Sequence, residues 1–199
     1  MLSDATSQRI TLRRAASTAA LMLALVFVAC RATPPPIAES HADSQSDLPK
    51  PLGLVSDFAG KLSAEKKSQL ETLLKTFAER GGIDFAVVTI PYEWLKDEAI
   101  ESYSLRLGQG WGVGRGSQKL GLLLLVAIKG PGADGLYRGG TRLEVSRKLE
   151  SDMTNEQAGE IIRKMRDDFQ QGRFDQAVTV GVQLIVSTLA QKRGFAITQ

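Results

Sequence analysis

The chain has 199 residues, enough for one domain and a targeting segment, and its 43% hydrophobic and 24% charged residues are ordinary for a globular domain. A single cysteine excludes an intramolecular disulfide. Of the formal charge of +3, residues 1–29 contribute +2 through three arginines and one aspartate, which leaves about +1 for the rest. The sequence pI of about 9.1 is therefore weak support for nucleic-acid binding, and we expect none.

Residues 1–29 have the pattern of a signal peptide. Arg9, Arg13 and Arg14 precede an uncharged, mostly apolar run from Ala15 to Ala29. That run is shorter than the roughly 20 residues that a membrane-spanning helix needs. Arginines before a short apolar segment predict an exported protein with a cleaved leader. The residues after the arginine pair do not support twin-arginine export.

The apolar run ends at Cys30, within the sequence "FVAC". These residues resemble a bacterial lipobox, although Phe27 is bulkier than the leucine usual at its position. We therefore predict lipidation of Cys30, which would anchor the protein to a membrane of the cell envelope or periplasm. The alternative is an ordinary signal peptide whose apolar segment happens to contain a cysteine.

Residues 30–53 are predicted to form the lipidated cysteine and a disordered linker. Five of the seven prolines lie in this range, with small and polar residues and few large apolar ones, so it lacks the surface needed to form a core. His41, the only histidine, also lies here. The folded domain is predicted to occupy residues 54–193.

Periodic apolar residues in this domain predict a small mixed sheet sandwiched by helices, an α/β or α+β fold. Ser63 is a candidate N-cap for the first helix, and Thr154 begins a capping box with Gln157. The expected order is helix, strand, helix, strand, strand, helix, helix. The ranges are 64–80, 83–90, 97–109, 120–128, 141–145, 155–169 and 177–189, with the third strand antiparallel to the second.

The glycines of "GWGVGRG", residues 110–116, raise the question of a phosphate-binding loop. Phosphate loops follow a strand and open a helix, whereas here a helix precedes and a strand follows. The order favours a structural bend that ends the helix, with Trp111 in the core. The domain also has no histidine and no available cysteine, which excludes a Ser-His-Asp triad, a Cys-His pair and a conventional zinc site.

Five segments in order resemble the TPM domain family, named after thylakoid-lumen phosphatase and photosystem II repair proteins. They are "VSDFAGKLSAEKKSQLETLL", "DFAVVTIP", "IESYSLRLGQGWGVGRGSQKLGLLLLVA", "LEVSRKLESDMTNEQAGEII" and "FQQGRFDQAV". The resemblance implies a helix–sheet–helix domain that is exported and often membrane-tethered. It also implies a cleft in which carboxylates bind a cation, and acid phosphatase activity in some members.

Two of the acidic residues that the resemblance leads us to expect are replaced in this chain. Lys119 and Asn155 stand where the family tends to have aspartates, while Asp57 and Glu150 match family acids. A unit-charge pair at ~4 Å contributes roughly 4 kcal/mol at an effective dielectric constant near 20, so a lysine in place of an aspartate disfavours a dication. We therefore predict no metal cofactor, and calcium is disfavoured unless Asp57 and Asn155 retain a degenerate site.

The same replacement favours an anion. Arg115 and Lys119 beside exposed loop amides are candidate anion ligands, and the alternative is that both are solvated loop cations. Asp57 also has an alternative role, because an aspartate can accept hydrogen bonds from the amides of its own turn.

The sequence therefore favours a membrane-tethered, non-catalytic module that binds a cell-envelope protein and has a degenerate acidic site. The alternative is a phosphatase-like hydrolase of phosphomonoesters, with Asp57 and Glu150 as catalytic candidates. That reaction needs both acids in one cleft with Arg115 or Lys119.

Overall fold

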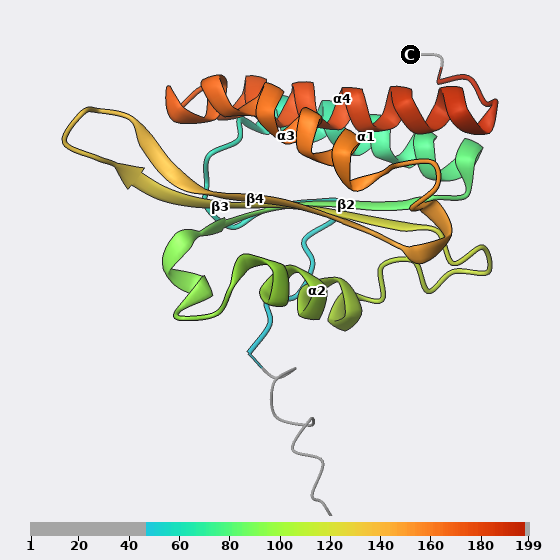
Figure 1. Cartoon of the computed structure of the whole chain (residues 1–199), viewed down its shortest axis with the longest axis horizontal. Helices are drawn as coiled ribbons and strands as arrows, with labels where there is room; N and C mark the ends of the chain where they lie inside the picture. The colour runs from blue at the N-terminus through green and yellow to red at the C-terminus, as the bar shows by residue number, and fades with distance from the viewer. Residues whose placement is uncertain (1–46, 198–199) are drawn as a thin grey trace, which may run out of the picture. The chain divides into compact units, whose positions relative to one another are not determined.

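Aliphatic runs form the middle of a four-stranded sheet that lies between two layers of helices (Figure 1). A computed structural model describes residues 47–197. The predicted signal peptide, Cys30 and most of the predicted linker lie outside the described residues. The elements are β1 (Val55–Asp57), α1 (Ala64–Gly81), β2 (Asp84–Pro91), η1 (Tyr92–Leu95), α2 (Ile100–Trp111), β3 (Gly121–Pro131), β4 (Tyr137–Val145), η2 (Arg147–Leu149), α3 (Asn155–Gln170) and α4 (Phe174–Arg193).

The sheet order is β1-β2-β3-β4, with the first three strands parallel and β4 antiparallel to β3. Helices α1, α3 and α4 cover one face, and α2 covers the other. This arrangement explains why β3 is apolar at almost every position: alternate residues face opposite helical layers, and both layers exclude water. Leu122 and Leu124 pack on the α1, α3 and α4 side, while Leu123 and Leu125 pack on the α2 side.

Helix periodicity predicted the core faces of the helices correctly. In α1, the side chains of Leu70, Leu74 and Phe77 are buried. The capping box of α3 is present, since the Thr154 hydroxyl accepts from the Gln157 amide and the Gln157 side chain accepts from the Thr154 amide, at 3.2 and 3.0 Å. The mixed α/β fold is therefore as expected, and no helix within residues 47–197 is long and apolar enough to cross a membrane.

The observed elements differ from the prediction in three ways. First, β1 was missed, because three residues show no periodicity and this strand exists only through its pairing with β2. Second, β4 begins at Tyr137 rather than 141, because its N-terminal half belongs to an exposed hairpin that lacks an alternating pattern. Third, α2 begins at Ile100 rather than 97, and α4 begins at Phe174 rather than 177, two residues after Gly172, which has a left-handed φ of 72°.

The segment before β1 contacts the α2 side of the sheet. Leu48 packs against the apolar cluster on that face, and the indole Nε1 of Trp111 donates to the carbonyl oxygen of Pro49 at 2.7 Å. These two residues fall within the range predicted as linker, so contacts with the domain begin before the predicted boundary at 54. Trp111, which the sequence placed in the core, is only half-buried and packs against the apolar cluster on this face.

Candidate functional site

Asp57 ends β1 and organises the turn into α1. Gly60 adopts a left-handed φ of 62°, which turns the chain so that two amides point back at the carboxylate. The carboxylate accepts from the amide of Lys61 at 3.1 Å and from the amide of Leu62 at 3.0 Å. The hydroxyl of Thr89 on β2 donates to the same carboxylate. Asp57 therefore fixes a turn and joins it to the neighbouring strand.

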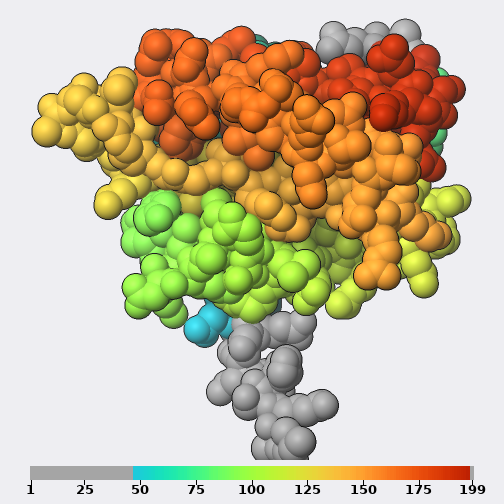
Figure 2. Space-filling view, viewed as in Figure 1, coloured from blue at the N-terminus to red at the C-terminus, as the bar shows by residue number. Residues whose placement is uncertain are grey.

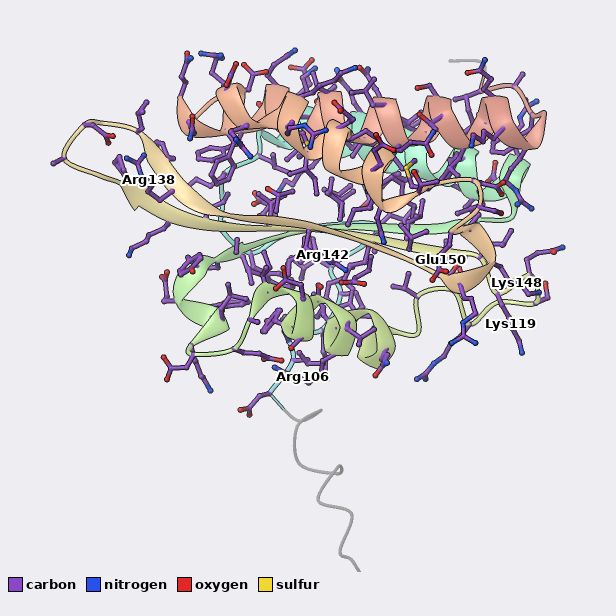
Figure 3. The ribbon with its side chains drawn as sticks, in the orientation of Figure 1. Arg106, Lys119, Arg138, Arg142, Lys148 and Glu150 are labelled. Atoms are coloured by element: carbon purple, nitrogen blue, oxygen red, sulfur yellow. The ribbon has the colours of Figure 1, made fainter. Side chains whose placement is uncertain are left out.

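The other candidate residues lie at the opposite end of the sheet from Asp57. Asp57 pairs with Thr89 and Thr89 with Val126, whereas Lys119 precedes the start of β3 at Gly121. Five residues of strand separate Val126 from Gly121, which corresponds to about 17 Å. Glu150 follows the end of β4, at the same end as Lys119, as Figure 3 shows. Asn155 is exposed at the first position of α3.

The described residues consequently do not bring Asp57 and Glu150 into one cleft. Residues 47–197 also contain no group of three or more histidine, cysteine, aspartate or glutamate side chains that could hold a metal ion. The arrangement that the hydrolase alternative requires, two carboxylates beside Arg115 or Lys119, is not found in this part of the chain.

The glycine-rich loop between α2 and β3 is a structural bend. Gly112 ends α2 in the left-handed conformation, with φ of 71°. Gly114 lies directly against Gly121: a Cβ atom added to Gly121 would be 2.6 Å from the Gly114 Cα. The glycines therefore let two backbone segments meet, which is the role the order of elements predicted, rather than forming a cradle at the start of a helix.

The end of the sheet beside this loop is basic. Arg115 and Lys119 are exposed and have no ion pair among the described residues. Lys148, from η2, extends its ammonium to the carbonyl oxygen of Gln118 at 3.2 Å, which places a third cation beside the loop. This contact joins residues 30 positions apart in the chain, so no local sequence pattern indicated it. Three cations at this end could attract an anion, but all three are solvated.

Glu144 on β4 and Glu150 in the β4–α3 connection have different surroundings. Glu144 accepts from Arg142 Nε at 2.8 Å and from the buried hydroxyl of Ser104 on α2 at 2.7 Å, so it links β4 to α2. Glu150 is exposed and forms no ion pair within residues 47–197. Of these two acids, only Glu144 forms an ion pair among the described residues.

A groove of about 930 Å³ lies on the α2 side, between η1, α2 and the segment before β1. Four of its charged groups form two ion pairs: Arg106 lies 2.6 Å from Glu98, and Lys96 lies 3.6 Å from Asp47. Glu93, which also lines the groove, is exposed and has no ion pair among the described residues. The hydrogen bonds that Arg106 donates to the Glu98 carboxylate raise the pKa of Arg106. Burial raises the pKa of Tyr103, an effect that the Arg106 guanidinium opposes and the Glu98 carboxylate reinforces. Pairing therefore neutralises four of the five charged groups in this groove.

A second groove, of about 290 Å³, runs between β4 and α3. Residues Tyr137–Thr141 form one side, and Met165, Arg166 and Phe169 are among the residues on the other. Arg166 is exposed and makes no ion pair in the part of the chain that the structure describes. The sequence did not predict this groove, because its shape depends on how α3 packs beside the β4 edge of the sheet.

Comparisons with known proteins agree with this architecture. The sequence matches the TPM domain over residues 55–188. The fold is similar to the solution NMR structure of the N-terminal domain of a protein from P. gingivalis, with a TM-score of 0.61 and 25% sequence identity. That similarity covers 78% of this chain and 93% of the other. A search of curated proteins gave no match. The match over most of the folded region shows that the chain belongs to the TPM domain family.

Proposed function

We propose that this protein is a TPM-domain protein of the cell envelope, tethered to a membrane through Cys30, and that it acts as a non-catalytic binding module. The observation that carries the proposal is the environment of Asp57. Its carboxylate is occupied by two backbone amides of its own turn and by the Thr89 hydroxyl. Asp57 therefore has a structural role that accounts for it without a bound cation or a substrate.

The distribution of the other candidates supports the same proposal. Lys119 and Glu150 lie at the end of the sheet away from Asp57, and the cations beside them are solvated. A hard-cation site needs several oxygen ligands, with carboxylates supplying most of the charge. The exposed acids at this end, Glu150 and Asp84, lie among lysines and arginines, and no group of three or more potential ligand side chains forms within residues 47–197. We therefore call the acidic site degenerate.

Membrane fractionation of cells that produce the full chain tests the tether. The native chain is expected in the membrane fraction, and a Cys30→Ser variant is expected in the soluble fraction or as an uncleaved precursor, because lipidation requires the thiol. An Asp167→Ala variant, altered at an exposed residue of α3, is the matched control and should behave like the native chain. If the Cys30→Ser variant remains in the membrane fraction as a processed chain, the proposal of a lipid tether at Cys30 is wrong.

A further inference from the structure

The sheet has one long free edge, on β4. Within residues 47–197, this strand hydrogen-bonds only with β3, and no backbone hydrogen bond joins residues 138–144 to any other segment. In Figure 2 the atoms of β4 reach the surface as a band between α3 and α2, so helices do not cover this edge. The opposite edge, β1, has only three residues. An open edge presents unpaired amides and carbonyls, which can pair with another extended chain.

The register identifies which residues of β4 present these groups. The amide of Ser146 donates to the carbonyl oxygen of Gly121 at 2.9 Å, so these two residues form a hydrogen-bonded pair. Hydrogen-bonded pairs alternate along an antiparallel ladder. The residues whose amides point away from β3 are therefore Gly139, Thr141, Leu143 and Val145. Gly139 and Thr141 also line the groove beside α3.

The groove at this edge has the features of a peptide site. A Cβ at Gly139 would lie 2.0 Å from the Ala127 carbonyl oxygen, and a Cβ at Gly140 would lie 2.8 Å from the Ile100 side chain, so packing within the chain accounts for both glycines. The groups that an added strand would use are the outward amides and carbonyls of β4. The half-buried Ile162, with the nearly buried Met165 and Phe169 behind it, forms the apolar part of the wall on α3. Strand addition beside a helix, with main-chain bonds and a side-chain groove, is an established mode of peptide recognition.

The charged residues that line the groove indicate which kind of peptide would bind there. Its lining residues include two arginines and no acid. Arg138 is engaged by Asp134 at 2.5 Å, and this contact lowers the pKa of Asp134, so that carboxylate is ionised near neutral pH. Arg166 has no ion pair among residues 47–197, so its charge is available to a partner. An acidic side chain on an added strand would complement it.

We propose that the β4–α3 groove binds an extended, acidic peptide segment of a partner protein, which adds to β4 as a fifth strand. This inference rests on the proposed role of the protein as a binding module, and it names the surface and the chemistry of the partner.

Selection from a displayed library of random eight-residue peptides, panned on the full chain, tests this proposal. The selected peptides are expected to be enriched in aspartate and glutamate. Their affinities are then measured by fluorescence anisotropy with two pairs of variants. Thr141→Pro removes an outward amide without removing a bond to β3, and proline is tolerated at such edge positions. Thr141→Val retains that amide and is its control.

The second pair tests the charge. Arg166→Glu reverses the free cation of the groove, and Lys164→Glu makes the same charge change at an exposed position of α3 that does not line it. We expect at least a tenfold loss of affinity for Thr141→Pro and for Arg166→Glu, and native affinity for both controls. Thermal unfolding of each variant separates loss of binding from loss of folding.

Three results would overturn the proposal: no peptide selected, selected peptides without acidic enrichment, or native affinity in Thr141→Pro. Dimerisation of the native chain that Thr141→Pro abolishes, seen by sedimentation, would assign the edge to a second copy instead of an acidic peptide. Any of these results leaves the fractionation of the Cys30→Ser variant unchanged, so failure of this site is distinguishable from failure of the tether.

Discussion

At the scale of single residues, Asp57 shows how a matched motif position can have a structural explanation. The sequence allowed two roles for it, a ligand of a cation or an acceptor for its own turn. The structure provides the acceptor role in full, with two amides and one hydroxyl. The choice was not available from the sequence because Thr89 comes from another strand, 32 residues away.

Replacement of Asp57 by alanine is therefore expected to destabilise the fold. The variant leaves the amides of Lys61 and Leu62 and the Thr89 hydroxyl without this acceptor, which costs about 1–3 kcal/mol. Chemical denaturation monitored by circular dichroism measures the loss. The control Asp167→Ala changes an exposed acid of α3, and its free energy of unfolding should stay within about 0.5 kcal/mol of that of the native chain. Equal stability of both variants would contradict the structural role.

Tyr103 gives a prediction about pH. Its pKa is raised mainly by burial, so the folded chain holds the phenolic proton more tightly than the unfolded chain does. The associated stability is fully present below about pH 10, the usual tyrosine pKa, and is lost as pH rises through the raised value. In an ultraviolet titration of the three tyrosines, Tyr103 should ionise last, and Tyr103→Phe should remove that last step. A last step that persists in this variant would show that another tyrosine is responsible.

At the scale of elements, the sequence predicted those helices and strands that depend on capping residues and apolar patterns within their own segments. Helix α3 could be placed from its capping box and apolar stripe, and β3 from its aliphatic run. The strand β1 and the separation of Asp57 from Glu150 could not be predicted, because both depend on strand order and direction, which no periodicity encodes. The β4–α3 groove was missed for the same reason, since its two walls are brought together only by the packing of α3.

The loop between α2 and β3 provides a test of its structural interpretation. A Gly121→Ala variant would place a Cβ 2.6 Å from the Gly114 backbone, and relief of such overpacking costs about 1–3 kcal/mol. Gly130→Ala is the matched control, because it lies in the same strand and a Cβ there meets nothing within 4 Å. Thermal unfolding should separate the two variants clearly. If Gly121→Ala were as stable as the control, the glycines would need another explanation, such as a ligand.

At the scale of the whole molecule, the features divide between the two ends and the long edge of the sheet. At one end, Asp57 holds the turn that leads into α1. At the other end, exposed cations lie beside the loop between α2 and β3. The open edge of β4 lies beside a groove lined by Arg166, which has no ion pair among the described residues. A hydrolase would need the acids and the cations together. A binding module needs an accessible surface with distinct chemistry, which the β4 edge provides.

The central claim, that this chain binds rather than hydrolyses, is tested most directly by phosphomonoester hydrolysis. The full chain is assayed with p-nitrophenyl phosphate, with calcium or magnesium and with a chelator, beside Asp57→Asn and Glu150→Gln variants whose folding is verified. We predict no turnover that distinguishes the native chain from either variant under any of these conditions. Turnover by the native chain that depends on a divalent cation and disappears in the folded Asp57→Asn variant would contradict the account.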